Sequence, residues 1–194
     1  MHFKKLNIEG INREINNFKM DKSDSYLESY PFFTNYFSEL SPIEESNLAI
    51  SSHFIYGWMP TIIHLNKEDL VKVLYLLNSV KSGHIIDAKD SLILKKCINN
   101  SLVGLSKLLH FINPEQYAIW DSRIYRYLTG KKSQYSLSSP EKFLIYQNEM
   151  RILAHDNSFK DFKIRVFEKL GYHISSMRVI EMVMFEADKR VNSL

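Results

Sequence analysis

The sequence from Asn99 to Arg123 reads NNSLVGLSKLLHFINPEQYAIWDSR. In its first half, apolar residues recur at the spacing of an α-helix and form one narrow stripe, which consists of Leu102, Leu105, Leu109 and Ile112. Lys107 points nearly opposite to this stripe, so we expect it outside the core, and His110 flanks the stripe. The segment therefore predicts a short helix over 102–111 that presents a lysine on its far side.

The residues that follow predict a change of direction. Asn113-Pro114 ends the helix, because proline lacks a backbone N–H and disfavours helix in the residue before it. Tyr117-Ala118-Ile119 is the best candidate in the chain for an extended piece, and Asp121 is expected to cap a helix that ends at Thr129-Gly130. A lysine on one helix and a carboxylate at the start of the next are thus expected to face a common cleft.

Helix caps recur through the rest of the chain, whereas strand alternation is almost absent. The other expected helix starts are Ser41-Pro42 for a helix over about 42–52, Asn66, Asp87 or Asp90, Ser139-Pro140, Ser158 with Asp161, and Ser175. The expected ends are Ser82-Gly83, Gly171 and, for the last helix, about Arg190. The first forty residues are expected to be helical too, with a break at Pro31. The sequence therefore predicts an all-α fold of about eight to ten short helices.

Length and composition indicate a compact protein. The chain has 194 residues, of which 45% are hydrophobic and 24% charged, with 6 Gly and 5 Pro. These values exclude disordered and low-complexity classes. We expect a single helical domain, and a division into two lobes, about 1–85 and 86–194, would place the cleft between them. No apolar run approaches the roughly 18 residues of a membrane span and no signal segment is visible, so a cytoplasmic protein is expected.

Positive charge is concentrated in the middle of the chain. Residues 89–132 hold eight Lys and Arg against three Asp and Glu, whereas residues 1–88 hold eight against eleven. This distribution is compatible with a nucleic-acid surface and equally with a solvated helix face.

Metal and cofactor chemistry is not indicated by the sequence. Cys97 is the only cysteine, which excludes internal disulfides, thiolate zinc sites and a four-cysteine iron–sulfur cluster. It lies in an apolar helical pattern and is expected to be inert core. The seven histidines show no metal-ligand spacing, so we expect no metal and no cofactor.

A family resemblance rests on residues 87–130. A helix, a Gly-containing hairpin, a helix with an early lysine, an extended return and an aspartate that opens the next helix resemble the helix-hairpin-helix DNA glycosylases, particularly proteins with an 8-oxoguanine DNA glycosylase-like fold. The resemblance implies that Val103-Gly104 is the hairpin that holds the DNA backbone through main-chain amides. It implies that Lys107 attacks the sugar C1′ and that Asp121 activates this lysine or stabilises the developing sugar cation. Without a cysteine quartet, the chain resembles the cluster-free branch.

Alternative roles remain open for each of these residues and their neighbours. Lys107 can be a solvated surface lysine, and Asp121 can be a plain helix cap, a role that is compatible with catalysis. Base stacking is a hypothesis for His110, Trp120 and Tyr117, for which core packing is the alternative. Phosphate contacts are a hypothesis for Arg123, Arg126 and Lys131, for which salt bridges or solvation are the alternative.

These observations favour a DNA glycosylase that flips a damaged or modified base out of double-stranded DNA and excises it, with or without AP-lyase activity through Lys107. A monomer is expected. DNA repair and defence against modified phage DNA are both compatible with the sequence. The alternatives from other classes are a noncatalytic helical DNA-binding module and a helical interaction protein whose basic segment is only surface.

Overall fold

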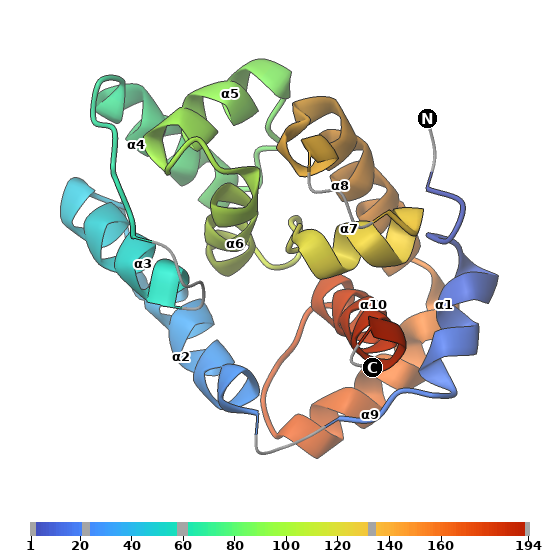
Figure 1. Cartoon of the computed structure of the whole chain (residues 1–194). Helices are drawn as coiled ribbons and strands as arrows, with labels where there is room; N and C mark the ends of the chain where they lie inside the picture. The colour runs from blue at the N-terminus through green and yellow to red at the C-terminus, as the bar shows by residue number, and fades with distance from the viewer. Residues whose placement is uncertain (1–2, 21–23, 58–61, 132–134, 193–194) are drawn as a thin grey trace.

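The computed structural model describes residues 3–20, 24–57, 62–131 and 135–192, and within them the chain is all-helical with no strand, as the sequence predicts (Figure 1). Ten α-helices and two short 3₁₀ helices follow one another in these residues. In chain order they are α1 (Ile8–Ile15), α2 (Ser25–Glu39), α3 (Glu45–Gly57), α4 (Leu70–Lys81), α5 (Ala88–Cys97), α6 (Leu102–Ile112), α7 (Ser122–Thr129), η1 (Tyr135–Ser138), α8 (Pro140–Ala154), η2 (Asn157–Phe159), α9 (Lys160–Leu170) and α10 (Ser176–Asn192). None of the described helices is long and apolar enough to cross a membrane.

Several predicted caps are confirmed. Asp87 opens α5 in a capping box with Asp90, so both aspartates take part in the same turn. Ser139 caps α8 by accepting a hydrogen bond from the backbone N–H of Lys142. Gly130 and Gly171 end α7 and α9 in the left-handed conformation, with φ of 70° and 81°, which glycine adopts without steric cost.

The predicted break at Pro31 is wrong, because Pro31 lies inside α2. A proline at this position cannot donate to the carbonyl of Leu27, four residues earlier. That carbonyl instead accepts a hydrogen bond of 2.9 Å from the hydroxyl of Tyr172, far along the chain. A tertiary contact thus replaces the missing helical hydrogen bond.

Three predicted helix starts are displaced. The helix expected over 42–52 begins at Glu45, because both backbone groups of Ile43 are hydrogen-bonded to the side chain of Asn78 on α4. Asn66 accepts from the N–H of Glu68 in a turn before α4, which starts three residues later than expected. Asp156, not Ser158, caps the turn that leads into α9.

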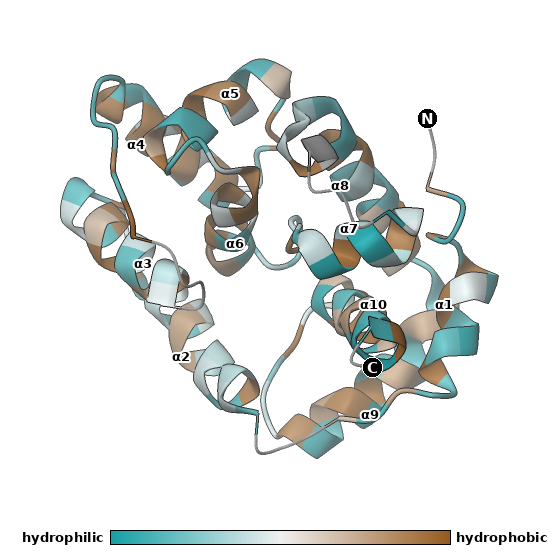
Figure 2. Cartoon of the chain, viewed as in Figure 1, coloured by the Kyte–Doolittle hydropathy of each residue, from teal (hydrophilic) through white to brown (hydrophobic). Residues whose placement is uncertain are grey.

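Two helices organise the packing. α6 packs against α2, α3, α4 and α5, whereas α10 packs against α1, α7, α8 and α9. Figure 2 shows apolar residues on the inward sides of the helices that surround these two. The predicted division into two lobes at about residue 85 stays a prediction, but α1 contacts α10 and therefore lies apart from α2 to α4 (Figure 1).

The central position of α6 corrects the interpretation of its helical wheel. Every residue of α6 except Val103 is buried, including the side opposite to the leucine stripe. Lys107, which the wheel placed outside the core, has only 8% of its surface exposed. Its side chain is therefore enclosed by protein over most of its surface.

The expected extended piece, Tyr117-Ala118-Ile119, lies outside every described helix, and no described strand lies beside it. Residues 117–120 cross the core, and apart from the N–H of Tyr117, which donates to the carbonyl of Asn113, their hydrogen bonds are formed with side chains. The N–H and C=O of Ala118 both bind the amide of Gln147 at 2.8 and 2.7 Å, and the carbonyl of Ile119 accepts from the hydroxyl of Tyr146. The N–H of Trp120 donates to the hydroxyl of Ser106 on α6 at 2.9 Å. These bonds fix the direction in which the chain enters α7.

We expect Gln147→Leu to lower the free energy of unfolding by about 2–4 kcal/mol, because it leaves two buried backbone groups of Ala118 unpaired. Urea unfolding followed by circular dichroism measures the change. Asn148→Leu, at the exposed neighbouring position of α8, is the matched control and should change stability by less than about 0.5 kcal/mol. Equal stability of the two variants would show that the side-chain bonds to residue 118 are dispensable.

Candidate functional site

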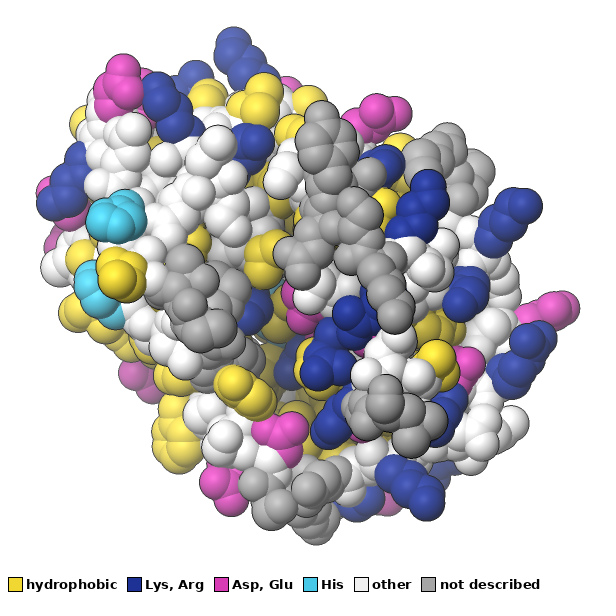
Figure 3. Space-filling view, viewed as in Figure 1, with side chains coloured by type: hydrophobic (Ala, Val, Ile, Leu, Met, Phe, Trp, Pro, Cys, Tyr) yellow, Lys and Arg dark blue, Asp and Glu magenta, His cyan; other side chains and the backbone are white. Residues whose placement is uncertain are grey.

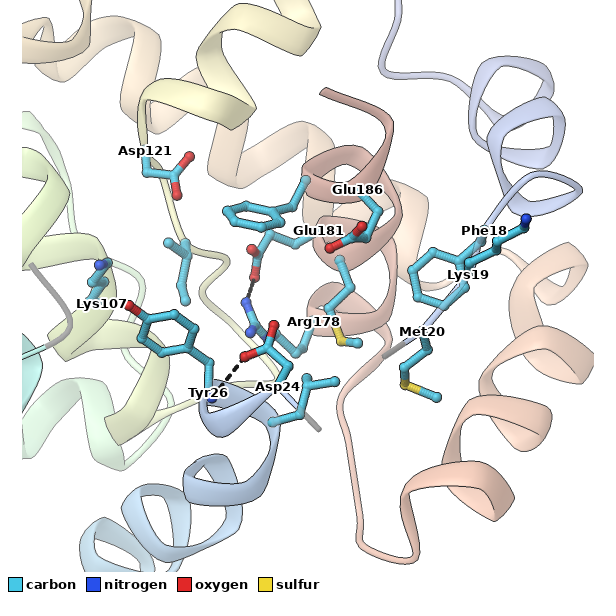
Figure 4. Close-up of a pocket in the computed structure, with 14 residues that line it drawn as sticks. Phe18, Lys19, Met20, Asp24, Tyr26, Lys107, Asp121, Arg178, Glu181 and Glu186 are labelled. Atoms are coloured by element: carbon cyan, nitrogen blue, oxygen red, sulfur yellow. Dashed lines mark hydrogen bonds and ion pairs between the residues drawn. The ribbon is translucent and has the colours of Figure 1, made fainter. Parts of the chain in front are cut away.

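A cavity of about 190 Å³ lies where α6, the extended return, α10 and the chain before α2 meet (Figure 4). Both residues that the sequence singled out for catalysis, Lys107 and Asp121, line it. The other lining residues are Phe18, Lys19, Met20, Asp24, Tyr26, Leu27, Ile119, Arg178, Glu181, Met182, Phe185 and Glu186. The cavity therefore combines four carboxylates, three cationic side chains and an aromatic and aliphatic wall.

Lys107 reaches the cavity from the middle of α6. Its amine makes no hydrogen bond to any described residue, although only 8% of the surface of Lys107 is exposed. Burial lowers the pKa of the amine below its usual value, the nearby charges of Asp121 and Glu181 oppose this shift, and Arg178 adds to it. A buried amine with a lowered pKa and no hydrogen-bond partner among the described residues is available to a ligand.

Asp121 lines the cavity at the start of α7, and its charge acts on the amine of Lys107. Its Oδ1 atom accepts hydrogen bonds of 2.9 Å from the backbone N–H groups of Arg123 and Ile124. The predicted helix cap is therefore confirmed, and Oδ2 makes no hydrogen bond to a described residue. The two roles considered for this residue are compatible, because one carboxylate oxygen caps the helix while the carboxylate lines the cavity with Lys107.

The floor of the cavity holds a buried ion pair. Nη1 of Arg178 donates to Oε2 of Glu181, one turn later on α10, and the guanidinium lies 5.3 Å from the ring centroid of Tyr30. Burial raises the pKa of Glu181 to about 7, although the positive charge of Arg178 opposes this shift. Nε of Arg178 is buried and has no hydrogen-bond partner among the described residues.

The contribution of α10 was not predicted from the sequence. Its cavity residues are Arg178, Glu181, Met182, Phe185 and Glu186. They recur at i, i+3, i+4, i+7 and i+8, the spacing of a helix face that usually contacts a core. Three of these five positions hold charged residues, whereas a buried helix face is normally apolar. This pattern in the sequence could have identified α10 as part of a polar site.

The predicted stacking residues His110, Trp120 and Tyr117 do not reach the cavity. All three are buried in the core, and all three use their polar atoms for hydrogen bonds within the protein. Nδ1 of His110 must donate to the carbonyl of Tyr117 at 2.7 Å, which leaves Nε2 to accept from the hydroxyl of Tyr30 at 3.0 Å. The aromatic side chains that do line the cavity are Phe18, Tyr26 and Phe185.

The predicted hairpin residues Val103-Gly104 are helical. They form the first turn of α6, and the N–H of Gly104 donates to the hydroxyl of Ser101. Glycine is needed here because a Cβ would lie 2.6 Å from the hydroxyl oxygen of Tyr56. The turn between α5 and α6 lies earlier, at Asn99-Asn100, where both residues have positive φ. Its Asn99 is hydrogen-bonded to the backbone of residues 62 and 64, so this turn is anchored to the chain before α4.

The three residues predicted to contact phosphate differ in their interactions within the protein. Arg126 forms two hydrogen bonds with Asp188 of α10, so the salt-bridge alternative holds for it. Arg123 lies 3.7 Å from the same carboxylate and 5.1 Å from the ring of Phe185, at the rim of the cavity. Lys131 is exposed beyond the end of α7. Figure 3 shows Lys and Arg side chains gathered beside a hollow at the centre of this face, over α7 and α10.

No cluster of three or more potential metal ligands occurs among the described residues. Cys97 is buried and unpaired, and burial raises the pKa of its thiol, as expected of inert core. The cavity residues offer two lysines, one arginine and four carboxylates for chemistry.

No protein-family model matches the chain, and the searches of curated proteins and of solved structures found no significant match.

We expect acid to destabilise the fold through His110. Burial lowers its pKa from 6.5 to about 3, so the unfolded chain takes up a proton below pH 6.5 that the folded protein refuses. The stability that depends on neutral His110 is complete above pH 6.5 and is lost as the pH falls toward 3. Between pH 7 and pH 5 the wild type should lose about 2 kcal/mol more than His110→Gln, measured by urea unfolding. Equal losses in the two proteins would contradict a neutral buried His110.

Proposed function

We propose that this protein is a DNA glycosylase that excises a base through the cavity between α6 and α10. The observation that carries the proposal is the position of Lys107: a buried amine with lowered pKa and no hydrogen-bond partner among the described residues, in one cavity with the carboxylate of Asp121. Such an amine serves as a nucleophile toward an electrophilic carbon, because desolvation favours its neutral form.

The size and walls of the cavity support a single base as the ligand. At about 190 Å³ it is smaller than the roughly 300 Å³ at which pockets for drug-sized ligands begin, so it fits one ring system and not a larger molecule. Phe18, Tyr26 and Phe185 offer aromatic faces on which a base can stack. A base in duplex DNA reaches such a cavity only after it is flipped out of the stack, at a cost of a few kcal/mol.

The surface beside the cavity supports a polyanionic partner. Lys19 lines the mouth and is exposed, and Arg123 lies at the rim against Phe185. Lys and Arg side chains gather on this face (Figure 3). The phosphate groups on both sides of a flipped nucleotide would meet these cations while the base enters the cavity.

In the proposed reaction, the lone pair of the Lys107 amine forms a bond to the sugar C1′ as the C1′–N bond to the base breaks. The electrons of that bond leave with the base, which then takes up one proton. One proton of the former amine passes by way of the Asp121 carboxylate to the sugar ring oxygen, and the ring opens to a Schiff base between Nζ and C1′. The carboxylate also stabilises the positive charge that develops on the sugar.

Lys107→Gln should abolish the covalent adduct that borohydride traps by reducing this Schiff base. The reason is that an amide nitrogen is not a nucleophile, whereas the shorter polar side chain of glutamine still fits the place of the lysine. The measurement is the shift of labelled DNA with an abasic site on a denaturing gel. Lys72→Gln, on the exposed face of α4, is the matched control and should trap as the wild type does. Full trapping by Lys107→Gln would assign the nucleophile to another amine.

Asp121→Asn should slow base release by about 100-fold or more at near-normal DNA affinity, because the amide oxygen keeps the cap on α7 while the charge at the sugar is lost. Single-turnover release of bases from duplexes with different lesions measures the rate, and salt-dependent gel shifts measure the affinity. Base release without any trapping would describe a monofunctional glycosylase that depends on Asp121 alone. DNA binding without release of any base would leave the noncatalytic DNA-binding module.

A further inference from the structure

Glu181 is a buried acid that the reaction described above does not yet use. Only 1% of its surface is exposed, and it lines the cavity with Lys107 and Asp121. It lies one turn before Phe185 on the same face of α10, so a base that stacks on Phe185 presents an edge to its carboxyl group. Its Oε2 atom accepts from Arg178, whereas Oε1 makes no hydrogen bond to a described residue (Figure 4).

We propose that Glu181, in its protonated form, delivers a proton to the departing base, a role that rests on the proposed glycosylase function. When the C1′–N bond breaks, the acid gives this proton to a ring nitrogen of the base, and Glu181 returns to its carboxylate form. The base leaves neutral and no further proton donor is needed.

Burial in the cavity favours the protonated form of Glu181 and the neutral form of Lys107. The charges of Asp121 on Lys107 and of Arg178 on Glu181 oppose these two shifts. Burial lowers the pKa of Lys107 and raises the pKa of Glu181 to about 7, and both shifts favour the neutral pair.

The groups around Glu181 make it the better proton carrier of the two acids. Arg178 on α10, Lys107 on α6, Asp121 before α7, Tyr30 on α2 and Tyr146 on α8 act on its charge. Among them, Asp121 already uses one oxygen for two backbone N–H groups of α7, and the two tyrosines have pKa values raised by burial, so they keep their protons. Glu181 alone combines full burial, an oxygen without a described partner and a place beside Phe185.

A proton donor at Glu181 indicates which class of base the cavity accepts as substrate. A neutral purine or pyrimidine leaves poorly as an anion and gains from a proton, whereas a base that is already cationic by alkylation does not need one. We therefore infer that the cavity serves neutral bases, whether normal, modified or oxidised. A preformed abasic site has no base to protonate, so its reaction with Lys107 should not depend on Glu181.

The experiment compares Glu181→Gln with the wild type on two substrates across pH 5.5–9.5. Base release by the wild type should show a bell-shaped pH dependence. At low pH the amine of Lys107 is protonated and cannot attack, and at high pH Glu181 has lost the proton that the departing base needs. Glu181→Gln should release the base about 100-fold more slowly at neutral pH and should lose the alkaline limb. Borohydride trapping on abasic-site DNA should rise with pH in both proteins and agree within about threefold.

Each outcome separates this role from the proposed function. If the wild type neither releases a base nor traps, the glycosylase proposal fails, and the role of Glu181 fails with it. If the wild type does both and Glu181→Gln keeps the same bell-shaped profile, only the role of Glu181 is overturned. If Glu181→Gln loses trapping on abasic-site DNA to the same extent as base release, Glu181 positions Lys107 and does not protonate the base. Arg178→Lys, which keeps a cation beside the carboxyl group, should retain the bell shape, and its loss would assign the profile to Arg178 instead.

Discussion

The backbone of residues 117–120 crosses the core outside any helix, and each of its buried polar groups needs a hydrogen-bond partner. In a sheet, the next strand would supply these partners. Here the side chains of Ser106, His110, Tyr146 and Gln147 supply most of them from α6 and α8, and the N–H of Tyr117 donates to the carbonyl of Asn113. These bonds orient the chain so that Ile119 and Asp121 face the cavity while Trp120 faces the core. The position of Asp121 in one cavity with Lys107 is therefore a consequence of how the segment satisfies its backbone.

The cavity holds several charged side chains that are buried away from water, where a charge is least favourable. Lys107, Arg178 and Glu181 are all more than nine-tenths buried, and replacing such groups by apolar ones is often neutral or stabilising. A fold that only needed stability would have leucine or methionine at these positions, as it does at Met182 and Leu105. We propose that the two buried cationic side chains and the two carboxylates around this small space serve a proton-transfer reaction, and the proposal of an enzyme in place of a binding module rests on them.

Features that depend on neighbouring residues in the sequence were predictable. The caps at Asp87, Asp121 and Ser139 and the ends at Gly130 and Gly171 satisfy backbone groups within one turn, so the sequence contains all that determines them. The placement of Lys107 and Asp121 in one cavity was also predictable, because only one turn and one short connecting segment separate them.

Features that depend on distant residues were not predictable. Pro31 stays helical because of Tyr172, and His110 and Trp120 are buried because helices from other parts of the chain cover them. A helical wheel shows the direction of a side chain but not what lies in that direction, which is also why Lys107 was expected outside the core. Arg178 and Glu181 reach the cavity from α10, at the far end of the sequence. The measurement that tests the central claim most directly is mass-spectrometric mapping of the borohydride-reduced protein–DNA complex. A link to Lys107 is the expected result, whereas a link to Lys19 at the mouth, or to any other amine, would contradict the assignment of the cavity as the reactive centre.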